Sequence, residues 1–302
     1  ASVQRALEGF VRALAKELKR GITAQTLLVA HGAEHLLEGP LSFLLSPRSA
    51  YVSGQVIRLG EYTTSMTCDT TKPLMERQIM VTGAARGIGA SIAETLARDG
   101  ARVICVDVPQ AQDALRAVAK RLEGRALPLD ITDPAAAAML VEAANTDGGW
   151  DGLVHNAGIT RDKTIARMAP HHWSSLVNVN LIAPEIITQA LLDAGALRPR
   201  ARIVCVSSIS GIAGNLGQTN YAFSKAGVIG FAQGLSPSLA GQGMAINVVA
   251  PGFIETQMTA AIPLAIREAG RRMNSMGQGG QPVDVARSEE HTSELQSHSG
   301  IS

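Results

Sequence analysis

The stretch that decides the fold is Gln78-Ile-Met-Val-Thr-Gly-Ala-Ala-Arg-Gly-Ile-Gly89. Its first five residues form an apolar, β-prone run, which predicts a buried parallel strand over 78–82. The residues after the last glycine have helical periodicity, which predicts a helix near 87–99. A glycine-rich loop between a strand and a helix is the context that a dinucleotide-binding turn requires, although an ordinary strand-to-helix turn can look the same.

Each glycine of this loop has a separate physical role in that interpretation. Gly83 permits the tight turn, Gly87 lets the main chain approach a pyrophosphate, and Gly89 allows the helix to pack close to the strand. The unpaired amides at the start of the helix are then available to phosphates. We therefore take these three glycines as candidate cofactor-binding residues, together with their loop neighbours Arg86 and Ile88.

A second predicted strand, over residues 102–107, ends on a carboxylate. Asp107 lies twenty residues beyond Gly87, the spacing at which an acidic side chain accepts hydrogen bonds from ribose hydroxyls. A carboxylate there also repels a 2′-phosphate, so the sequence favours NAD(H). Because Arg86 would suit the phosphorylated cofactor, NADP(H) remains a possible alternative.

From Gln78 onward, predicted strands and helices alternate strictly. This alternation implies right-handed crossovers and a parallel sheet with helices on both faces. The sequence therefore predicts an α/β, doubly wound, Rossmann-like fold, whose ligands bind outside the carboxyl ends of the strands. Further strands are expected at 125–130, 152–155, 202–207 and 244–249, and further helices near 110–122, 134–146, 171–194, 219–240 and 259–274.

Three reactive side chains lie between Ser208 and Lys225. Ser208 follows the apolar run at 203–206, and Tyr221 precedes Lys225 by four residues, so a helix would place the last two on one face. A phenol with a pKa near 10 is a poor base at neutral pH, and a nearby ammonium lowers that pKa. The group therefore predicts proton transfer, although Tyr and Lys at this spacing also occur by chance.

The composition disfavours several classes of partner. The 302 residues include 27 basic and 26 acidic side chains, so no nucleic acid or anionic membrane is expected as a partner. No run of eighteen apolar residues and no signal peptide is predicted, which makes a cytoplasmic location the expectation. Cys68, Cys105 and Cys205 lack a metal-ligand spacing, and we expect the last two to be buried in strands.

With these features, residues 78–286 resemble the short-chain dehydrogenase/reductase family. Within that family they are most similar to the reductases of 3-oxoacyl thioesters. His155 is a departure, since the family commonly has Asn there, and we expect this histidine to be structural. The matching motifs are the glycine loop at 82–89, Asp130-Ile131, Asn156-Ala-Gly158, Asn180, Ser208, Tyr221 with Lys225, and Pro251-Gly-Phe-Ile-Glu-Thr256.

The resemblance implies reversible hydride transfer between NAD(P)(H) and a 3-oxoacyl thioester of acyl-carrier protein or CoA. Tyr221 would donate the proton and Ser208 would hydrogen-bond the substrate oxygen. Lys225 would lower the pKa of Tyr221 and bind the nicotinamide ribose, and Asn180 would hold a water that passes protons to Lys225. The remaining implied contacts are Asp130 and Ile131 to the adenine, Asn156, Ala157 and Gly158 along the cofactor cleft, and Pro251, Gly252, Ile254 and Thr256 at the nicotinamide end.

Other activities stay open at this point. The resemblance is also compatible with a secondary-alcohol dehydrogenase of the same family, or with an inactive cofactor-binding fragment. For the full-length form it implies a homo-oligomer.

Residues 1–60 look like the end of a second copy of the same fold. Gly9-Phe10 matches Gly230-Phe231, and in that register Gln4 takes the place of Lys225. We therefore interpret 1–60 as an N-terminal partial repeat without a catalytic pair, joined to the rest by a linker at 61–77.

The C-terminal part of the chain suggests a truncation. Residues 78–286 are expected to lack the last helix and strand of the fold, and 287–302 look like the translation of a sequencing adapter. One hypothesis is that Tyr51–Leu59 fills the vacant strand position, parallel to Met244–Val249. The alternative is that the partial repeat packs by its helix against the outer helices.

Overall fold

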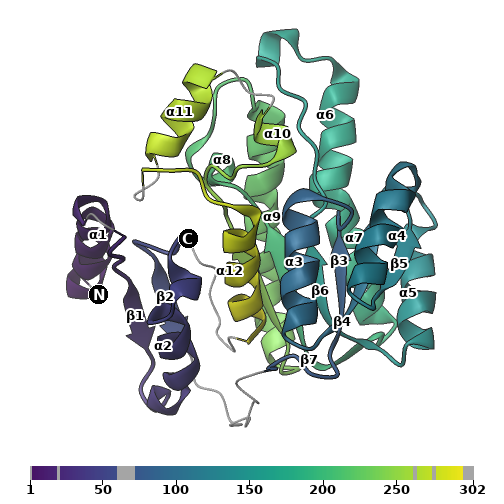
Figure 1. The fold of residues 1–302 in the computed structure, drawn as a ribbon, viewed down its shortest axis with the longest axis horizontal. Coiled ribbons are helices and arrows are strands. Elements are labelled where there is room, and N and C mark those ends of the chain that lie inside the picture. The colour runs from purple at the N-terminus through teal and green to yellow at the C-terminus, as the bar shows by residue number, and fades with distance from the viewer. Residues whose placement is uncertain (1, 19–20, 60–71, 261–263, 274–276, 295–302) are drawn as a thin grey trace.

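The structure is a computed structural model that describes residues 2–18, 21–59, 72–260, 264–273 and 277–294. A six-stranded parallel sheet carries helices on both faces, and a small two-stranded parallel sheet lies beside it (Figure 1). The predicted α/β, doubly wound fold is therefore confirmed.

The large sheet has the strand order β5-β4-β3-β6-β7-β8, with every neighbouring pair parallel. The order reverses between β3 and β6, which marks the place where ligands bind in open sheets of this type. The predicted strands are all present, and β7 begins earlier than expected because Leu197 pairs with Trp150 before a register shift. The bounds are β3 (Gln78–Thr82), β4 (Arg102–Asp107), β5 (Arg125–Pro128), β6 (Trp150–His155), β7 (Leu197–Val206) and β8 (Ala245–Val249).

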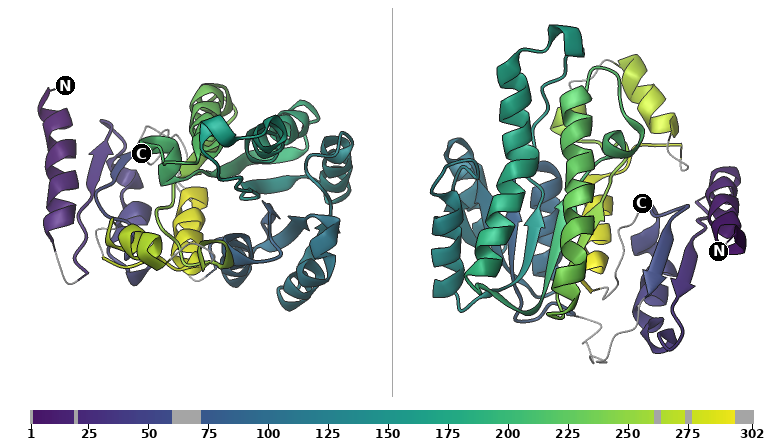
Figure 2. Two further views of the ribbon diagram at one scale, coloured as in Figure 1. Left: turned by 90° about the horizontal axis from the view of Figure 1, so that it is seen from above. Right: turned by 180° about the vertical axis from the view of Figure 1, so that it is seen from behind.

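Helices cover both faces of this sheet (Figure 2). Two separate hydrophobic clusters lie between the sheet and these helices, one on each face. Successive strand residues alternate between them, as Ile79 and Met80 do. One cluster is closed by α3 (Gly87–Arg98), α4 (Gln112–Arg121) and α12 (Pro282–Glu294), and the other by α5 (Ala136–Thr146), α7 (Ala183–Asp193) and α9 (Thr219–Ala240). The shorter segments are η3 (Pro109–Ala111), η4 (Ile165–Arg167), α8 (Ile209–Ala213), α10 (Gln257–Ala260) and α11 (Leu264–Met273).

The helix expected near 171–194 is interrupted. It consists of α6 (Pro170–Val177), a π-helical turn η5 (Asn178–Ile182) and α7. The whole segment Pro170–Asp193 has the length and the apolar composition that would allow a helix to cross a membrane. It contains polar residues, so it is not a continuous apolar run. Its side chains Leu176, Ile187 and Leu191 are buried in the core, so it is a core helix of the α/β fold.

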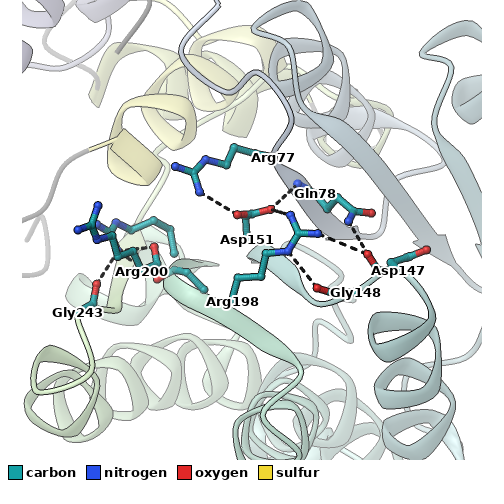
Figure 3. Close-up of polar contacts among 10 residues, drawn as sticks. Arg77, Gln78, Asp147, Gly148, Asp151, Arg198, Arg200 and Gly243 are labelled. Carbon is teal, nitrogen blue, oxygen red and sulfur yellow. Dashed lines mark hydrogen bonds and ion pairs between the residues drawn. The ribbon is translucent and has the colours of Figure 1, made fainter. Parts of the chain in front are cut away.

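A polar cluster ties together the amino ends of β3, β6 and β7 (Figure 3). Buried Asp151 accepts hydrogen bonds from Arg77 Nη1 (2.8 Å), the Gln78 amide (2.9 Å) and Arg198 Nη1 (2.9 Å). Arg198 also donates to the main-chain oxygen of Gly148. Because the sheet is parallel, this cluster lies at the end opposite to the one where ligands are expected.

The N-terminal unit contains α1 (Ser2–Glu17), β1 (Thr26–Val29), η1 (Glu34–Leu36), α2 (Glu38–Leu44), η2 (Pro47–Ser49) and β2 (Val56–Leu59). The hypothesis that Tyr51–Leu59 extends the large sheet is wrong, because β2 pairs with β1 and β8 pairs only with β7 among the described strands. The unit instead packs on α12 through α2 and η2, as the alternative proposed. Its interpretation as a partial repeat stays a prediction.

The expectation that the fold lacks its last helix also needs correction, because α12 occupies Pro282–Glu294. Proline in the first turn suits a helix start, and the Asp284 carboxylate accepts a hydrogen bond from the Gln281 amide (2.7 Å). Val285 and Ala286 are buried, and α12 packs against α3. The helix continues beyond Ala286 into residues expected to be an adapter-derived tail, an interpretation that stays a prediction; 295–302 lie outside the described residues.

Candidate active site

The glycine loop joins β3 to α3 at the carboxyl edge of the sheet. Gly83 and Gly87 have positive φ values of 69° and 61°, which glycine adopts without strain. A β-carbon on Gly89 would lie 2.0 Å from the main-chain oxygen of Gly83, so the helix approaches the turn as closely as predicted. At Gly87 no atom lies within 4 Å of that position, which leaves room beside the start of α3 for a pyrophosphate.

Asp107 at the end of β4 holds this loop in place. Its Oδ2 accepts a hydrogen bond from the Ala85 amide (2.9 Å), and its Oδ1 accepts one from the Val108 amide (2.8 Å). The carboxylate therefore lies beside the loop, where a ribose would bind. Arg86 is exposed and occupies the N-cap position of α3, and Ile88 is partly buried against the core.

The loop after β6 is locked to the glycine loop by Asn156. Its side-chain amide donates to the main-chain oxygens of Thr82 (3.0 Å) and Gly83 (3.3 Å). In return, Thr82 Oγ1 accepts hydrogen bonds from the main-chain amides of Asn156 and Ala157. Thr82 was not predicted to hold this loop; its hydroxyl at a strand end directly before a glycine was the available signal.

Ser208 and Tyr221 meet as the sequence predicted. Ser208 is the N-cap of α8, where its Oγ accepts from the Ser210 amide (3.2 Å), and its side chain lies close enough to the Tyr221 phenol to affect the pKa of that phenol. Burial raises the pKa of Tyr221 above its usual value, the Ser208 hydroxyl opposes this rise, and the Asp162 carboxylate adds to it. The pKa of Tyr221 is therefore raised and not lowered as expected, and burial of the phenol is the largest cause.

Lys225 lies one helical turn after Tyr221 and is buried. Its Nζ donates a hydrogen bond to the main-chain oxygen of Val206 (2.7 Å) and lies 5.7 Å from the centroid of the Tyr221 ring. Burial lowers the pKa of Lys225 to about 8. Ser207 reinforces the contact between β7 and α9, since its hydroxyl donates to the main-chain oxygen of Lys225 (2.7 Å).

Asn180 lies in the π-helical turn η5 and is 1% exposed. Its Oδ1 accepts from the Ile159 amide (2.8 Å), and its Nδ2 donates to the Ile159 oxygen (3.0 Å) and to Ser224 Oγ (3.2 Å). A β-carbon on Gly158 would lie 3.4 Å from Asn180 Oδ1 and 3.5 Å from Lys225 Nζ, so the two side chains approach the same glycine. Ser224, three residues after Tyr221, was missed by the sequence analysis.

The two residues expected to contact the adenine, Asp130 and Ile131, differ in their exposure. Asp130 is exposed, and its Oδ1 accepts from the amide and the hydroxyl of Thr132. Ile131 is 8% exposed and its side chain packs in the hydrophobic core, which leaves only its main chain for contact with a nucleotide. The expected contact of Asp130 and Ile131 with the adenine stays a prediction.

The segment expected at the nicotinamide end follows β8. Pro251 accepts a hydrogen bond at its main-chain oxygen from the Ile209 amide (3.0 Å), directly after Ser208. Gly252 is exposed, and a β-carbon there would meet no atom within 4 Å. Ile254 forms a parallel bridge with Gly280, and Thr256 exchanges hydrogen bonds with Thr259 at the start of α10.

Other side chains singled out in the sequence are structural. His155 is 4% exposed, its Nε2 lies 2.8 Å from Thr188 Oγ1, and burial lowers its pKa to about 4. Cys105 and Cys205 are buried, as predicted. Cys68 lies outside the described residues.

Comparison with known proteins agrees with this geometry. Residues 77–266 match the family model described as short chain dehydrogenase. The chain belongs to the short-chain dehydrogenase family. It is therefore an oxidoreductase, and enzymes of this family use NAD(H) or NADP(H).

Two relatives illustrate where in the short-chain dehydrogenase family the similarity lies. The chain is 42% identical over 186 residues to the 3-oxoacyl-(acyl-carrier-protein) reductase FabG of Escherichia coli (strain K12), which covers 61% of this chain and 75% of the relative. It is 42% identical over 211 residues to the reductase of the same name from Thermotoga maritima, covering 68% and 86%.

Proposed function

We propose that this chain is an NAD(H)-dependent reductase that converts 3-oxoacyl thioesters into 3-hydroxyacyl thioesters. The observation that carries the proposal is the position of the Tyr221 phenol, which lies close enough to the Ser208 side chain for Ser208 to affect its pKa and 5.7 Å from the buried ammonium of Lys225. The group lies at the carboxyl edge of the sheet that also holds the glycine loop. The names of the similar relatives support a 3-oxoacyl substrate.

Reduction of a carbonyl needs a hydride at carbon and a proton at oxygen. The reduced nicotinamide supplies the hydride when it is bound, and the proton comes from this chain. Because burial raises the pKa of Tyr221, its phenol is protonated at neutral pH, the state that a proton donor requires. Ser208 would donate a hydrogen bond to the substrate oxygen as negative charge develops there.

Lys225 and Asn180 would support the proton donor. A pKa of about 8 keeps Lys225 largely charged at neutral pH, so it can favour the phenolate left after proton transfer. The Nδ2 of Asn180 is engaged by Ile159 and Ser224, which fixes its side chain close to Lys225. We propose that a water held near Asn180 returns protons to Lys225.

A single assay tests the activity directly. Purified protein should oxidise NADH when acetoacetyl-CoA is added, and Tyr221→Phe should abolish turnover while leaving NADH binding, followed by fluorescence titration, nearly unchanged. Ser208→Ala should lower kcat by about 10²-fold, whereas Ser174→Ala, which removes an exposed hydroxyl on α6, should not change it. A fully active Tyr221→Phe variant would overturn the assignment.

Asp107 supports NAD(H) as the cofactor. Its carboxylate lies beside the glycine loop and would repel a 2′-phosphate there. Asp107→Asn keeps a hydrogen-bond acceptor but removes the charge, so we expect it to reduce the preference for NADH over NADPH in steady-state assays. Faster oxidation of NADPH than NADH by the wild type would contradict this part of the proposal.

The alternatives are separated by the same measurements. Turnover of simple ketones in preference to acetoacetyl-CoA would favour a secondary-alcohol dehydrogenase. NADH binding without turnover of any of these substrates would favour an inactive cofactor-binding protein. Comparing acetoacetyl-CoA with acetoacetyl acyl-carrier protein would identify the thioester carrier.

Assembly and location complete the proposal. Ile186 on α7 and Phe223 on α9 are 55% and 51% exposed, and apolar side chains on neighbouring outer helices suit contact with a second copy. We propose a cytoplasmic homo-oligomer. Size-exclusion chromatography with light scattering should then give a mass above that of one chain.

A further inference from the structure

Tyr51 connects the N-terminal unit to the chain that leads into α12. Its hydroxyl accepts a hydrogen bond from Gln278 Nε2 (2.7 Å) and donates one to the main-chain oxygen of Gly279 (3.2 Å). Figure 1 shows α12 between the N-terminal unit and α3, so these bonds lie where the two parts of the molecule meet.

The ring of Tyr51 also packs beside Gly280. A β-carbon on Gly280 would lie 3.4 Å from Cδ1 of Tyr51 and 2.8 Å from Cδ1 of Ile254. Both Gly279 and Gly280 are buried. The Tyr51 ring and the Ile254 side chain therefore both lie where a side chain on Gly280 would point, and they leave little space for one.

Gly280 pairs in turn with the segment after β8. Its amide donates to the main-chain oxygen of Phe253 (3.0 Å), and its oxygen accepts from the Glu255 amide (2.8 Å). Thr259 Oγ1 holds the same segment from the other side by donating to the Ile254 oxygen (2.8 Å). Residues 253–255 are thus fixed between Gly280 and the start of α10.

This segment begins beside the candidate catalytic group. Pro251 accepts the hydrogen bond from the Ile209 amide, and Ile209 directly follows Ser208. A continuous series of contacts therefore runs from Tyr51 through Gly279 and Gly280 to residues 251–256. Every link in it is a hydrogen bond, a main-chain bond or a van der Waals contact.

We propose that Tyr51 is a positioning residue for the reaction, which fixes the loop 251–256 through Gly279 and Gly280. The N-terminal unit would then contribute to the geometry of the cofactor and substrate site although it contains no candidate catalytic residue. The kinetic part of this proposal rests on the proposed reductase function. The structural part concerns only the order of the loop.

The test compares Tyr51→Phe, which removes both hydrogen bonds but keeps the ring, with Ser53→Ala as a matched control. Ser53 lies two residues away, and its Oγ accepts from the Ala24 amide within the N-terminal unit (3.4 Å). In the full chain, we expect Tyr51→Phe to speed amide hydrogen exchange of peptides covering 252–256 and 278–281 by about two- to tenfold, the range given by loss of one or two neutral hydrogen bonds. Ser53→Ala should leave both peptides unchanged.

Kinetics give a second readout. If the loop is loosened, KM for NADH should rise by a factor of similar size while kcat changes less. Gln278→Ala should reproduce part of the effect, and the double variant should add little because both changes break the same bond. Tyr51→Ala also removes the ring from Gly280 and should give the largest change.

The outcomes separate the two proposals. A lower melting temperature of Tyr51→Phe with unchanged exchange at 252–256 and unchanged KM would assign Tyr51 a purely structural role and overturn the inference. If the wild type shows no turnover, the proposed function fails, while the exchange measurement still decides whether Tyr51 orders the loop.

Discussion

Lys225 Nζ lies 2.7 Å from the main-chain oxygen of Val206, two residues before Ser208. This hydrogen bond links helix α9 to the end of strand β7, and so fixes the position of Tyr221 relative to Ser208. An ammonium buried in this way is costly, and its pKa of about 8 reflects that cost. A buried ammonium with a shifted pKa is typical of functional sites, which agrees with the role proposed for Lys225.

Replacement of Lys225 separates its effect on activity from its effect on stability. Lys225→Met keeps most of the side-chain volume and removes the charge, so we expect kcat/KM to fall by about 10²-fold or more. Thermal stability should change little or rise, because the desolvation cost of the ammonium disappears. Lys120→Met, at an exposed position on α4, is the control and should leave activity unchanged. Full activity of the Lys225 variant would contradict its role.

His155 predicts a pH dependence of stability. Its folded pKa of about 4 is below its unfolded value of 6.5, so as the pH falls from 6.5 to 4 the unfolded chain binds a proton that the folded protein does not. Folding is therefore destabilised progressively over this window, by about 3 kcal/mol at its lower end. His155→Asn removes this titration. As the pH falls from 6.5 to 4, the free energy of unfolding should therefore decrease less for the variant than for the wild type. Parallel pH profiles in urea unfolding would contradict the prediction.

The glycine loop gives a steric prediction. Gly89→Ala places a β-carbon 2.0 Å from the Gly83 oxygen, so we expect a loss of about 2 kcal/mol or more in urea unfolding and weaker NADH binding. Gly230→Ala is the matched control in the interior of α9. A β-carbon there meets no atom within 4 Å, and alanine favours the helix, so this variant should be as stable as the wild type or more so. Equal stability of the two variants would refute the close approach.

Replacement of Asp151 should lower the stability of the fold and leave the candidate active site intact. Asp151→Ala would leave Arg77, Arg198 and the Gln78 amide without their shared acceptor, at a cost of about 3 kcal/mol. The cluster lies at the amino ends of the strands, so NADH affinity of the folded variant should match that of the wild type. Asp113→Ala on α4 removes an exposed carboxylate as control. A change in NADH affinity that exceeds the change caused by Asp113→Ala would show that the two ends are coupled.

Periodicity and turn chemistry were sufficient to predict the large sheet. The alternation of apolar runs with helical patterns predicted all its strands, because each crossover in a parallel sheet is local in sequence. The spacing of Tyr221 and Lys225 predicted their common helix face. These features depend on short-range geometry, which a single sequence contains.

Features that depend on long-range packing were not predictable in this way. The pairing of β2 with β1, the packing of α12 on α3 and the raised pKa of Tyr221 each depend on which elements meet in space. The role of Asp107 depends partly on local sequence spacing and partly on long-range packing. Its spacing predicted a place near the glycine loop, but its hydrogen bond to the Ala85 amide could be found only from the structure.

The π-helical turn at Asn178–Ile182 has a consequence for how this chain tolerates change. A π-helical turn contains more residues per turn than the α-helix on either side of it. Deleting one residue between Pro170 and Asn178 would let the helix close into regular α-helical turns. Each residue of an α-helix turns by about 100°, so Asn180 would then rotate away from Ile159 and Ser224. Substitutions along the exposed face of this helix should therefore be tolerated far better than a deletion of a single codon.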